Sequence, residues 1–411
     1  MFHRLVLLIG LVLMTTVFSG CNSGYQETDS VAYILAVGVD KGSSTYQIAL
    51  PTAVGSTTGS SGKSKEKTTE TITIIAPTMA NLRSLSKTFV SRTLDASHNK
   101  VYIVGEEMAR AGLEDSLAPQ VRFYEYRGSE FIIIVKGSAD DFIRQNTPEL
   151  ETLPSKYYEN LMSLSPGTGF FVRTTLHNFY YGMKNNGIAA YAPLAAVNRQ
   201  IEESHKAPSE ATKSTVEYDE PGIIPRTGGN SVELMGLAVF RGDKMVGTLN
   251  NKETRAFSIV KGFFKDAYLS VADPFDPKHS ISIICWLKEK PKITVHLQDQ
   301  HAVIDIQVTI EGSITGNKMG INYNLDENRF LLEESFSQDI RHDIEQMIKH
   351  TQEYGSDITG FGLYARKYFR TYQEYTDFDW VDTYSNADVH VNVNVVIRRT
   401  GLLYNTSPFI Y

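Results

Sequence analysis

The feature that most constrains the fold is a strict alternation of apolar and polar residues near the C-terminus. In the stretch "HAVIDIQVTIEG" (301–312) the apolar residues occupy every second position: Ala302, Ile304, Ile306, Val308 and Ile310. The stretch "DVHVNVNVVIRR" (388–399) repeats the pattern: Val389, Val391, Val393, Val395 and Ile397. Side chains of a strand point alternately to its two faces, so both stretches predict strands with one buried and one polar face. This is typical of an antiparallel sheet that helices cover on one side.

Helical periodicity separates these two strands. From 327 to 354 apolar residues recur on one helical stripe: Phe336, Ile340, Ile344, Met347 and Ile348. Asp357 then stands where it can cap a further helix through "ITGFGLYARKYFRTY" (358–372). Two more strands are expected within 280–298. Residues 266–411 are therefore predicted to form an α+β domain.

The first 150 residues differ, because strand and helix patterns alternate along them. Apolar strands are expected in "VAYILAVGV", "TITIIA", "KVYIVG" and "FIIIV". A helix is expected to start near Pro77, because Leu82, Leu85 and Phe89 have helical spacing. Further helices are expected from Glu106-Glu107 and after Ser138, since acidic first turns and a capping hydroxyl suit helix starts. This order predicts an α/β domain over residues 21–150.

A middle domain is predicted over residues 151–265. It begins with helical pieces and a strand in "IAAYAPLAAVNRQ". The polar stretch 202–230 carries three prolines and is predicted to be a long loop, as is the stretch 55–70 in the first domain. A hairpin turning at Gly242-Asp243 follows, and the next stretch, "ETRAFSIVKG", fits either a helix or a strand. The domain is expected to use strands from both sides of its polar loop.

The N-terminus has the pattern of an export signal. Fourteen residues without charge (5–18) follow a positive start, whereas a transmembrane helix needs about 20 apolar residues. Ser19, Gly20 and Cys21 come next, and this end resembles the bacterial lipoprotein signal, which is cut before a cysteine that receives a diacylglyceryl group. We expect a signal peptide over 1–20 and a lipid anchor on Cys21. The alternative is an ordinary secretory signal with an incidental cysteine.

Charge and cysteine content exclude other classes. The formal net charge of −7 argues against a nucleic-acid partner, because phosphate binding needs clustered Lys and Arg. With Cys21 lipidated, Cys285 is the only thiol left, so no internal disulfide can form. Cys285 shares a strand face with Ile281, Ile283 and Leu287, which predicts a buried and unreactive side chain.

The histidines do not have the spacing of a metal site. The ten histidines include no His-Glu-x-x-His pattern. His342 and His350 lie eight residues apart, about 12 Å along a helix, which is too far to hold one ion. His98 is the most interesting single histidine, and we expect a structural role for it with a backbone or carboxylate partner.

Other candidate chemistry also has a structural interpretation. The acidic pairs Glu106-Glu107 and Asp140-Asp141 fall at helix starts, where caps and the helix dipole explain them. The glycine-rich "SPGTGFFV" lacks the Walker lysine and is predicted to be a turn. Several aromatic residues fit either a partner-facing surface or core packing: Tyr157, Tyr158, Tyr180, Tyr181, Tyr368, Phe369, Tyr372 and Tyr375. We expect no catalysis, no cofactor and no metal.

Seven stretches then follow the lipoprotein-type end in a fixed order. They are "VAYILAVGVDKG", "SHNKVYIVGEEMARAGL", "IIIVKGSADDFIRQNTPELETLPS", "PLAAVNRQ", "MGLAVFRGDKMVGTLNNKETRAFSIVKG", "GSDITGFGLYARKYF" and "DVHVNVNVVIRRTGL". Together they resemble the Ger(x)C family, the lipoprotein C subunits of germinant receptors in endospore-forming bacteria. The resemblance covers nearly the whole chain from Cys21 to Leu402.

The resemblance implies three mixed α/β domains, each a sheet with helices against it, and a receptor subunit without catalytic activity. It implies two membrane-embedded partners, the A-type and B-type subunits, and a place on the outer face of the spore inner membrane. It leaves direct nutrient binding open. Asn22 and Ser23 stand where the family usually has Trp-Asp, and 367–372 lacks the usual Pro and Trp. These departures leave the fold prediction intact and bear on which receptor the subunit serves.

The alternative function is that of a lipid-anchored solute-binding or scaffold lipoprotein of a transporter. A solute-binding protein would need two doubly wound lobes joined by a hinge. The alternating strands predicted in 266–411 favour the receptor subunit instead.

Overall fold

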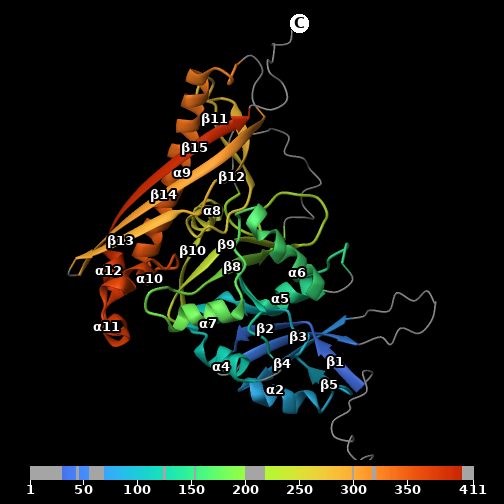
Figure 1. The fold of residues 1–411 in the computed structure, drawn as a ribbon. Helices are drawn as coiled ribbons and strands as arrows, with labels where there is room; N and C mark the ends of the chain where they lie inside the picture. The colour runs from blue at the N-terminus through green and yellow to red at the C-terminus, as the bar shows by residue number, and fades with distance from the viewer. Residues whose placement is uncertain are drawn as a thin grey trace, which may run out of the picture.

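The chain forms two β-sheets surrounded by helices (Figure 1). This computed structural model describes residues 30–42, 46–54, 69–123, 126–151, 154–199, 218–298, 300–316 and 321–399. The predicted combination of sheets and helices in a mixed α+β chain is confirmed. Cys21, most of the predicted loop 55–70 and the first part of the polar stretch 202–230 lie outside the described residues.

Ten strands form the first sheet, in the order β10-β9-β8-β7-β6-β2-β3-β1-β5, with β4 on β3. Their bounds are β1 Val31–Ile34, β2 Ala36–Lys41, β3 Tyr46–Val54, β4 Thr69–Ala76, β5 Thr93–Asp95, β6 Val101–Gly105, β7 Phe131–Val135, β8 Tyr191–Val197, β9 Val232–Arg241 and β10 Lys244–Leu249. Strands β2, β6, β7 and β8 run parallel, and the hairpin β9–β10 extends the sheet antiparallel to β8. The apolar sequences of β6 and β7 suit parallel strands that are covered on both faces.

The strands of the predicted middle domain lie in this same sheet, whereas we expected a separate sheet for them. The joining contact is the parallel pairing of β7 with β8, through Ile134 opposite Leu194. Strand β7 is almost entirely buried, so β8 covers what would otherwise be an apolar open edge. The domain boundaries at 150 and 265 stay predictions.

Helices cover both faces of the ten-stranded sheet. One face carries α2 Met79–Ser86, α3 Glu106–Ala111, α4 Glu114–Arg122 and α7 Leu176–Lys184. The other face carries α5 Ala139–Gln145 and α6 Pro154–Leu164, followed by the short 3-10 helix η2 Ser165–Gly167. The predicted helix starts are confirmed, and the Ser138 hydroxyl accepts the backbone N–H of Asp141 as the cap of α5. The stretch "SPGTGFFV", predicted to be a turn, begins as η2 and turns at Thr168.

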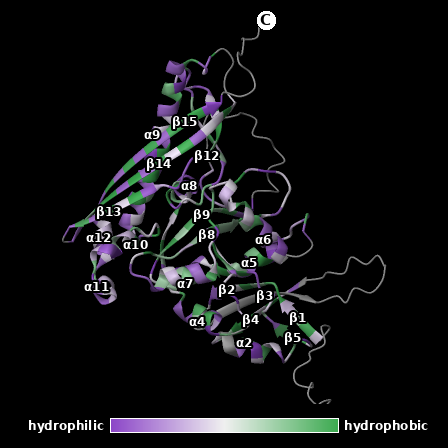
Figure 2. Ribbon diagram, in the orientation of Figure 1, coloured by the Kyte–Doolittle hydropathy of each residue, from purple (hydrophilic) through white to green (hydrophobic). Residues whose placement is uncertain are grey.

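The second sheet has five strands and contains the alternating stretches. Its strands are β11 Ala267–Ala272, β12 Ser280–Leu287, β13 Lys292–Gln298, β14 His301–Gly316 and β15 Asp388–Arg399. Figure 2 shows the alternation of hydrophobic and hydrophilic residues along β14 and β15. Strands β11 to β14 pair antiparallel as expected, but β15 pairs parallel to β14, so the sheet is mixed. The helix between β14 and β15 explains this, because a helical crossover allows the next strand to return in the same direction.

That crossover helix, α9 Asp326–Glu353, also protects the outer edge of β15. The Ser337 hydroxyl accepts the backbone N–H of Val395, and Glu333 Oε1 accepts that of Ile397. These side chains satisfy donors that an open strand edge would leave for another chain. No helix within the described residues is long and apolar enough to cross a membrane.

The remaining helices join the two sheets. The stretch "ETRAFSIVKG" forms a helix, α8 Asn251–Val260, which begins with a capping box between Asn250 and Glu253. The helix predicted over 358–372 is instead broken into α10 Phe361–Ala365 and the 3-10 helix η4 Arg366–Tyr368, after which α11 Tyr372–Asp377 and α12 Trp380–Ser385 follow. One continuous apolar core includes residues of β9, α8, α9, α10 and the second sheet.

Candidate functional site

A crevice of about 480 Å³ opens at the carboxyl ends of β2, β6 and β7. Helix α3 follows β6 onto one face of the sheet, and α5 follows the neighbouring β7 onto the other face (Figure 1). Open α/β sheets bind ligands beyond the carboxyl ends of their strands, so this crevice is the first place to look for a site. Its lining residues are Asp40, Lys41, Glu106, Glu107, Arg110, Gly137 and Ser138.

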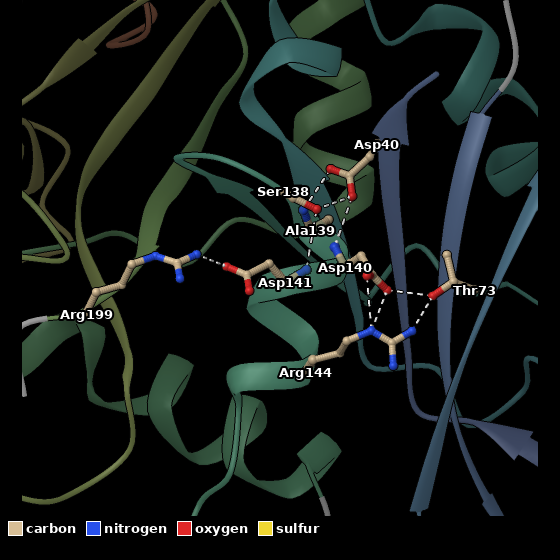
Figure 3. A network of polar contacts seen from close by, with 8 residues as sticks. All are labelled: Asp40, Thr73, Ser138, Ala139, Asp140, Asp141, Arg144 and Arg199. Carbon is tan, nitrogen blue, oxygen red and sulfur yellow. Dashed lines mark hydrogen bonds and ion pairs between the residues drawn. The ribbon is translucent and has the colours of Figure 1, made fainter. Parts of the chain in front are cut away.

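Asp40 fixes the geometry of the crevice. One of its carboxylate oxygens accepts the backbone N–H of Ala139 at 2.7 Å. The other accepts the Ser138 hydroxyl at 2.7 Å and the backbone N–H of Asp140 at 3.0 Å (Figure 3). A Cβ at Gly105 would lie 2.1 Å from the carboxylate, so only glycine fits there. Asp40 therefore binds the first turn of α5, next to the N-cap Ser138, and docks that helix on β2.

The acidic first turn of α5 is also engaged in structural contacts. Asp140 binds Arg144, with both oxygens 3.1 Å from Nε, and accepts the Thr73 hydroxyl at 2.6 Å. Asp141 pairs with Arg199 at 2.6 Å (Figure 3). These contacts tie α5 to β4 and to the end of β8. The structural interpretation of Asp140-Asp141 is confirmed.

The rim charges of the crevice are paired with one another. Glu106 and Arg110, one turn apart on α3, lie 2.7 Å from each other, and Lys41 lies 3.8 Å from Glu107. Exposed pairs of this kind contribute roughly 0–1 kcal/mol each. No histidine lines this crevice, and the described residues contain no group of three or more His, Cys, Asp or Glu side chains arranged for a metal. The charged residues of the crevice therefore hold β2, α3 and α5 together, through the hydrogen bonds of Asp40 to α5 and the ion pair of Lys41 with Glu107.

A second polar centre lies where the two sheets meet. The buried carboxylate of Asp357 accepts the backbone N–H of Gly360 at 2.7 Å, that of Gly362 at 2.9 Å and the indole N–H of Trp380 at 2.8 Å. Burial raises the pKa of Asp357, although these three hydrogen bonds act to lower it. Its backbone carbonyl accepts the N–H of Ala189, just before β8. Asp357 is not the N-cap of α10 as predicted, because the helix begins three residues later with Gly360 as its N-cap. Its carboxylate still binds the Gly362 N–H in the first turn, and Asp357 also connects the sheets.

The loop before β8 completes this joint. The side-chain amide of Asn186 donates to the carbonyls of Tyr375 and Phe378, at 3.0 and 2.7 Å. A Cβ at Gly187 would lie 2.8 Å from the carbonyl carbon of Gly362, so the two backbones touch there. These contacts hold α10 and α11 against the ten-stranded sheet.

A part-buried hydrogen bond between Glu253 and His350 joins α8 to α9. Glu253, which is 5% exposed, contacts His350 Nδ1 and also accepts the backbone N–H of Asn250. The pair borders a pocket of about 190 Å³ that Asp219 and Tyr354 also line. His350 thus holds two helices together, and His342 is not part of this contact.

The structure describes only one of the two cysteines, Cys285. Cys285 is fully buried, as predicted from its strand face, and burial raises the pKa of its thiol to about 12. The thiol is therefore protonated and unreactive at neutral pH. Cys21 lies outside the described residues, so the lipid anchor stays a prediction.

His98 is exposed, and its contacts in the structure are with a ring and a hydroxyl instead of the expected backbone or carboxylate partner. Its ring packs on Tyr33 with 4.2 Å between centroids, and its Nδ1 lies 3.1 Å from the Ser97 hydroxyl. The neighbouring Asn99 is buried and donates to Glu130 at 2.7 Å. Burial raises the pKa of Glu130 to about 7. The sequence reasoning missed Glu130, although a carboxylate directly before the apolar "FIIIV" was a usable signal.

The tyrosines divide between the two interpretations that the sequence left open. Tyr158 and Tyr375 are buried and belong to core packing. Tyr181, Tyr368 and Tyr372 are 49%, 43% and 64% exposed, which leaves large aromatic area on the surface.

Comparisons with known proteins place this fold. The family model described as "Spore germination protein N-terminal domain" matches residues 24–197, and "Spore germination B3/ GerAC like, C-terminal" matches residues 235–401. The chain is 21% identical over 403 residues to "Putative spore germination protein YfkR" of Bacillus subtilis (strain 168), covering 96% of both chains. It is 18% identical over 314 residues to "Spore germination protein GerQC" of Bacillus cereus, covering 76% of this chain and 77% of that one.

The fold has a solved counterpart. The "Crystal Structure of the GerBC protein" superposes with a TM-score of 0.51 at 18% identity, and the match covers 88% of this chain and 96% of that chain. The two family matches occur in one order on one chain, and the gap between them contains the whole polar stretch 202–230. This chain belongs to the Ger(x)C family of spore germination proteins.

Proposed function

We propose that this protein is the lipid-anchored C subunit of a spore germinant receptor and that it acts through contacts with two membrane-embedded partners, the A-type and B-type subunits. The observation that carries the proposal is the family match over both halves of the chain, 24–197 and 235–401. The site geometry agrees with a contact role, because the charged groups of the crevice are already bound to one another.

The anchor is proposed from the sequence. Cys21 follows Ser19-Gly20 at the end of a short apolar run, as in a lipoprotein signal. Two acyl chains on its thiol would hold the protein on a membrane, whereas one chain binds only marginally. A tether on the outer face of the spore inner membrane would keep the protein near the outer loops of both partners, which raises their effective concentration.

The sheet arrangement favours this role over a solute-binding protein of a transporter. Such a protein would have two doubly wound lobes, whereas the described strands form one ten-stranded sheet and one five-stranded sheet of different topology. Helices α8 and α10 pack in the core that connects them.

Deletion of the gene tests the receptor role. Spores without the protein should lose dye release and optical-density loss with one set of nutrients and keep the responses through other receptors. Blots should show lower amounts of both partner subunits. Normal responses to every nutrient, also after deletion of paralogues, would falsify the receptor role.

Replacement of the cysteine tests the anchor. Cys21→Ala should leave the membrane fraction or accumulate as an uncleaved precursor, and its germination defect should be milder than that of the deletion. Cys285→Ala is the matched control, because that thiol is buried. Normal processing and membrane retention of Cys21→Ala would contradict the anchor and leave the receptor role standing.

A further inference from the structure

The segment after the joint carries an unusual surface. Helix α10 buries Phe361 and Ala365, while Tyr364, Tyr368 and Tyr372 are 45%, 43% and 64% exposed. Three cations lie among these tyrosines, at Arg366, Lys367 and Arg370. These six residues, three tyrosines and three cations, are here called the α10–α11 surface. It lies at the side of the molecule below the second sheet (Figure 1).

Two of the three cations of this surface lie over aromatic rings. Arg366 lies 5.8 Å from the centroid of the Tyr372 ring, and Lys367 Nζ lies 5.1 Å from that of Tyr368. Within the part of the chain that the structure describes, none of the three cations has a carboxylate at ion-pair distance. This contrasts with the crevice, where each cation of the rim has a carboxylate partner.

The surface is also held in a fixed position. The Tyr368 hydroxyl donates to the carbonyl of Val295 at 3.1 Å, and the Arg370 backbone N–H is bound by Glu374 at 2.9 Å. Below it, Asp357 fixes the start of α10. Rings and cations that are ordered before binding lose less conformational entropy on contact.

We propose that the α10–α11 surface binds an acidic segment of one of the membrane-embedded receptor subunits. Tyr and Arg are among the side chains that dominate binding energy at protein interfaces. Three cations that have no carboxylate partner among the described residues, on a chain of net charge −7, select a partner with carboxylates. Glu374 and Asp377 border the surface and would repel an anionic bilayer, whereas a folded protein segment can avoid them. This inference rests on the proposed receptor function.

Charge reversal in the full chain tests the proposal. A triple variant should lower co-purification of one tagged partner subunit from spore membranes by tenfold or more. It combines Arg366→Glu, Lys367→Glu and Arg370→Glu. The matched control is Lys288→Glu, Lys290→Glu and Lys292→Glu, three exposed cations of the same span at the turn between β12 and β13, and it should retain the partner. Equal retention by both variants overturns the proposal.

Photocrosslinking covers the case in which the reversed variant is degraded. A photoreactive residue at position 364 or 372 of the otherwise unchanged chain should crosslink to the partner subunit. The same residue at Tyr268, which is 67% exposed on β11, should not. Equal crosslinking at both places, or none at 364 and 372, contradicts a specific surface.

Lipid binding is a distinct outcome. Flotation of the purified full chain with phosphatidylglycerol vesicles should equal that with phosphatidylcholine vesicles. A preference for phosphatidylglycerol that the triple reversal removes would assign the surface to the membrane and overturn the proposal. A wild-type chain that co-purifies with neither subunit would overturn the receptor role itself, and this surface with it.

Discussion

The charged crevice and the α10–α11 surface both contain Lys and Arg side chains, but these cations have carboxylate partners in the crevice and, for two of the three, tyrosine neighbours on the surface. The crevice brings acidic and basic side chains together at the carboxyl ends of three strands, where ligands often bind, yet its carboxylates already accept backbone, hydroxyl and cationic donors. On the α10–α11 surface, Arg366 and Lys367 lie beside tyrosine rings, and none of its three cations has a carboxylate at ion-pair distance within the described residues. The comparison shows that the partners of a charged residue indicate its role better than its place in the fold does.

The same contrast divides the single stretch 355–369. Its first part, around Asp357, forms the joint between the sheets. In its second part Tyr364 and Tyr368 are exposed, although Ala365 between them is buried. Substitutions should therefore change stability in the first part and partner binding in the second. The predictions below measure this division, from the largest expected change in stability to the smallest.

The largest loss is expected at Asp357. Asp357→Ala leaves three donors, Gly360 N–H, Gly362 N–H and the Trp380 indole, without their acceptor. Each buried unsatisfied donor costs about 1–3 kcal/mol, so the free energy of unfolding should fall by about 3–5 kcal/mol after partial rescue by water. Urea unfolding followed by tryptophan fluorescence measures it. Asp357→Asn keeps one oxygen and should lose less free energy of unfolding. Equal stability of the wild type and both variants would show that Asp357 does not stabilise the contact between the sheets.

A pH-dependent effect is expected at Glu130. Its folded pKa is about 7, above the ordinary 4.5, because burial disfavours the carboxylate. Between these values the unfolded chain binds fewer protons than the folded chain, so stability is full below about pH 4.5 and declines as pH rises to 7. The decline amounts to about 3 kcal/mol. Glu130→Gln should remove this part of the pH dependence, and parallel pH curves for both proteins would show that Glu130 does not titrate in this range.

Asp40 comes third. Asp40→Ala leaves the N-cap Ser138 in place but removes the acceptor of two first-turn N–H groups of α5, and the loss of such hydrogen bonds at a helix start typically costs about 1–2 kcal/mol. Thermal unfolding should show the loss, and hydrogen exchange should rise first at Ala139 and Asp140, whose N–H groups Asp40 binds. Glu107→Ala, on the exposed rim of the same crevice, is the control and should change little. A larger effect at Glu107 than at Asp40 would mean that the rim pairs, and not the hydrogen bonds of Asp40, hold the crevice.

Features of the fold that depend on neighbouring residues could be predicted from the sequence, whereas contacts between distant residues could not. The alternation in 301–312 and 388–399, the Ser138 cap and the burial of Cys285 follow from neighbouring residues. The parallel pairing of β15 and the shared ten-stranded sheet depend on which strands meet after long connections.

The same limit applied to the candidate site. Asp40 was missed because its partners lie about a hundred residues away in the chain, and periodicity cannot reveal such a contact. The sequence left both a core and a surface position open for the tyrosines, since only the packing of the folded chain decides between them. Tyr158 and Tyr372 show both outcomes.

The smallest change in stability is expected at the α10–α11 surface, and it separates surface from joint. The triple reversal of Arg366, Lys367 and Arg370 to Glu removes two cation–π contacts and no ion pair found in the described part of the chain. Exposed substitutions of this kind stay within about 0.5 kcal/mol each, so the urea midpoint should hardly move and its slope should not change. If stability stays while partner co-purification falls, the surface acts in binding alone. A loss as large as that at Asp357 would instead show that the cations brace α10, and the division of the stretch 355–369 would be wrong.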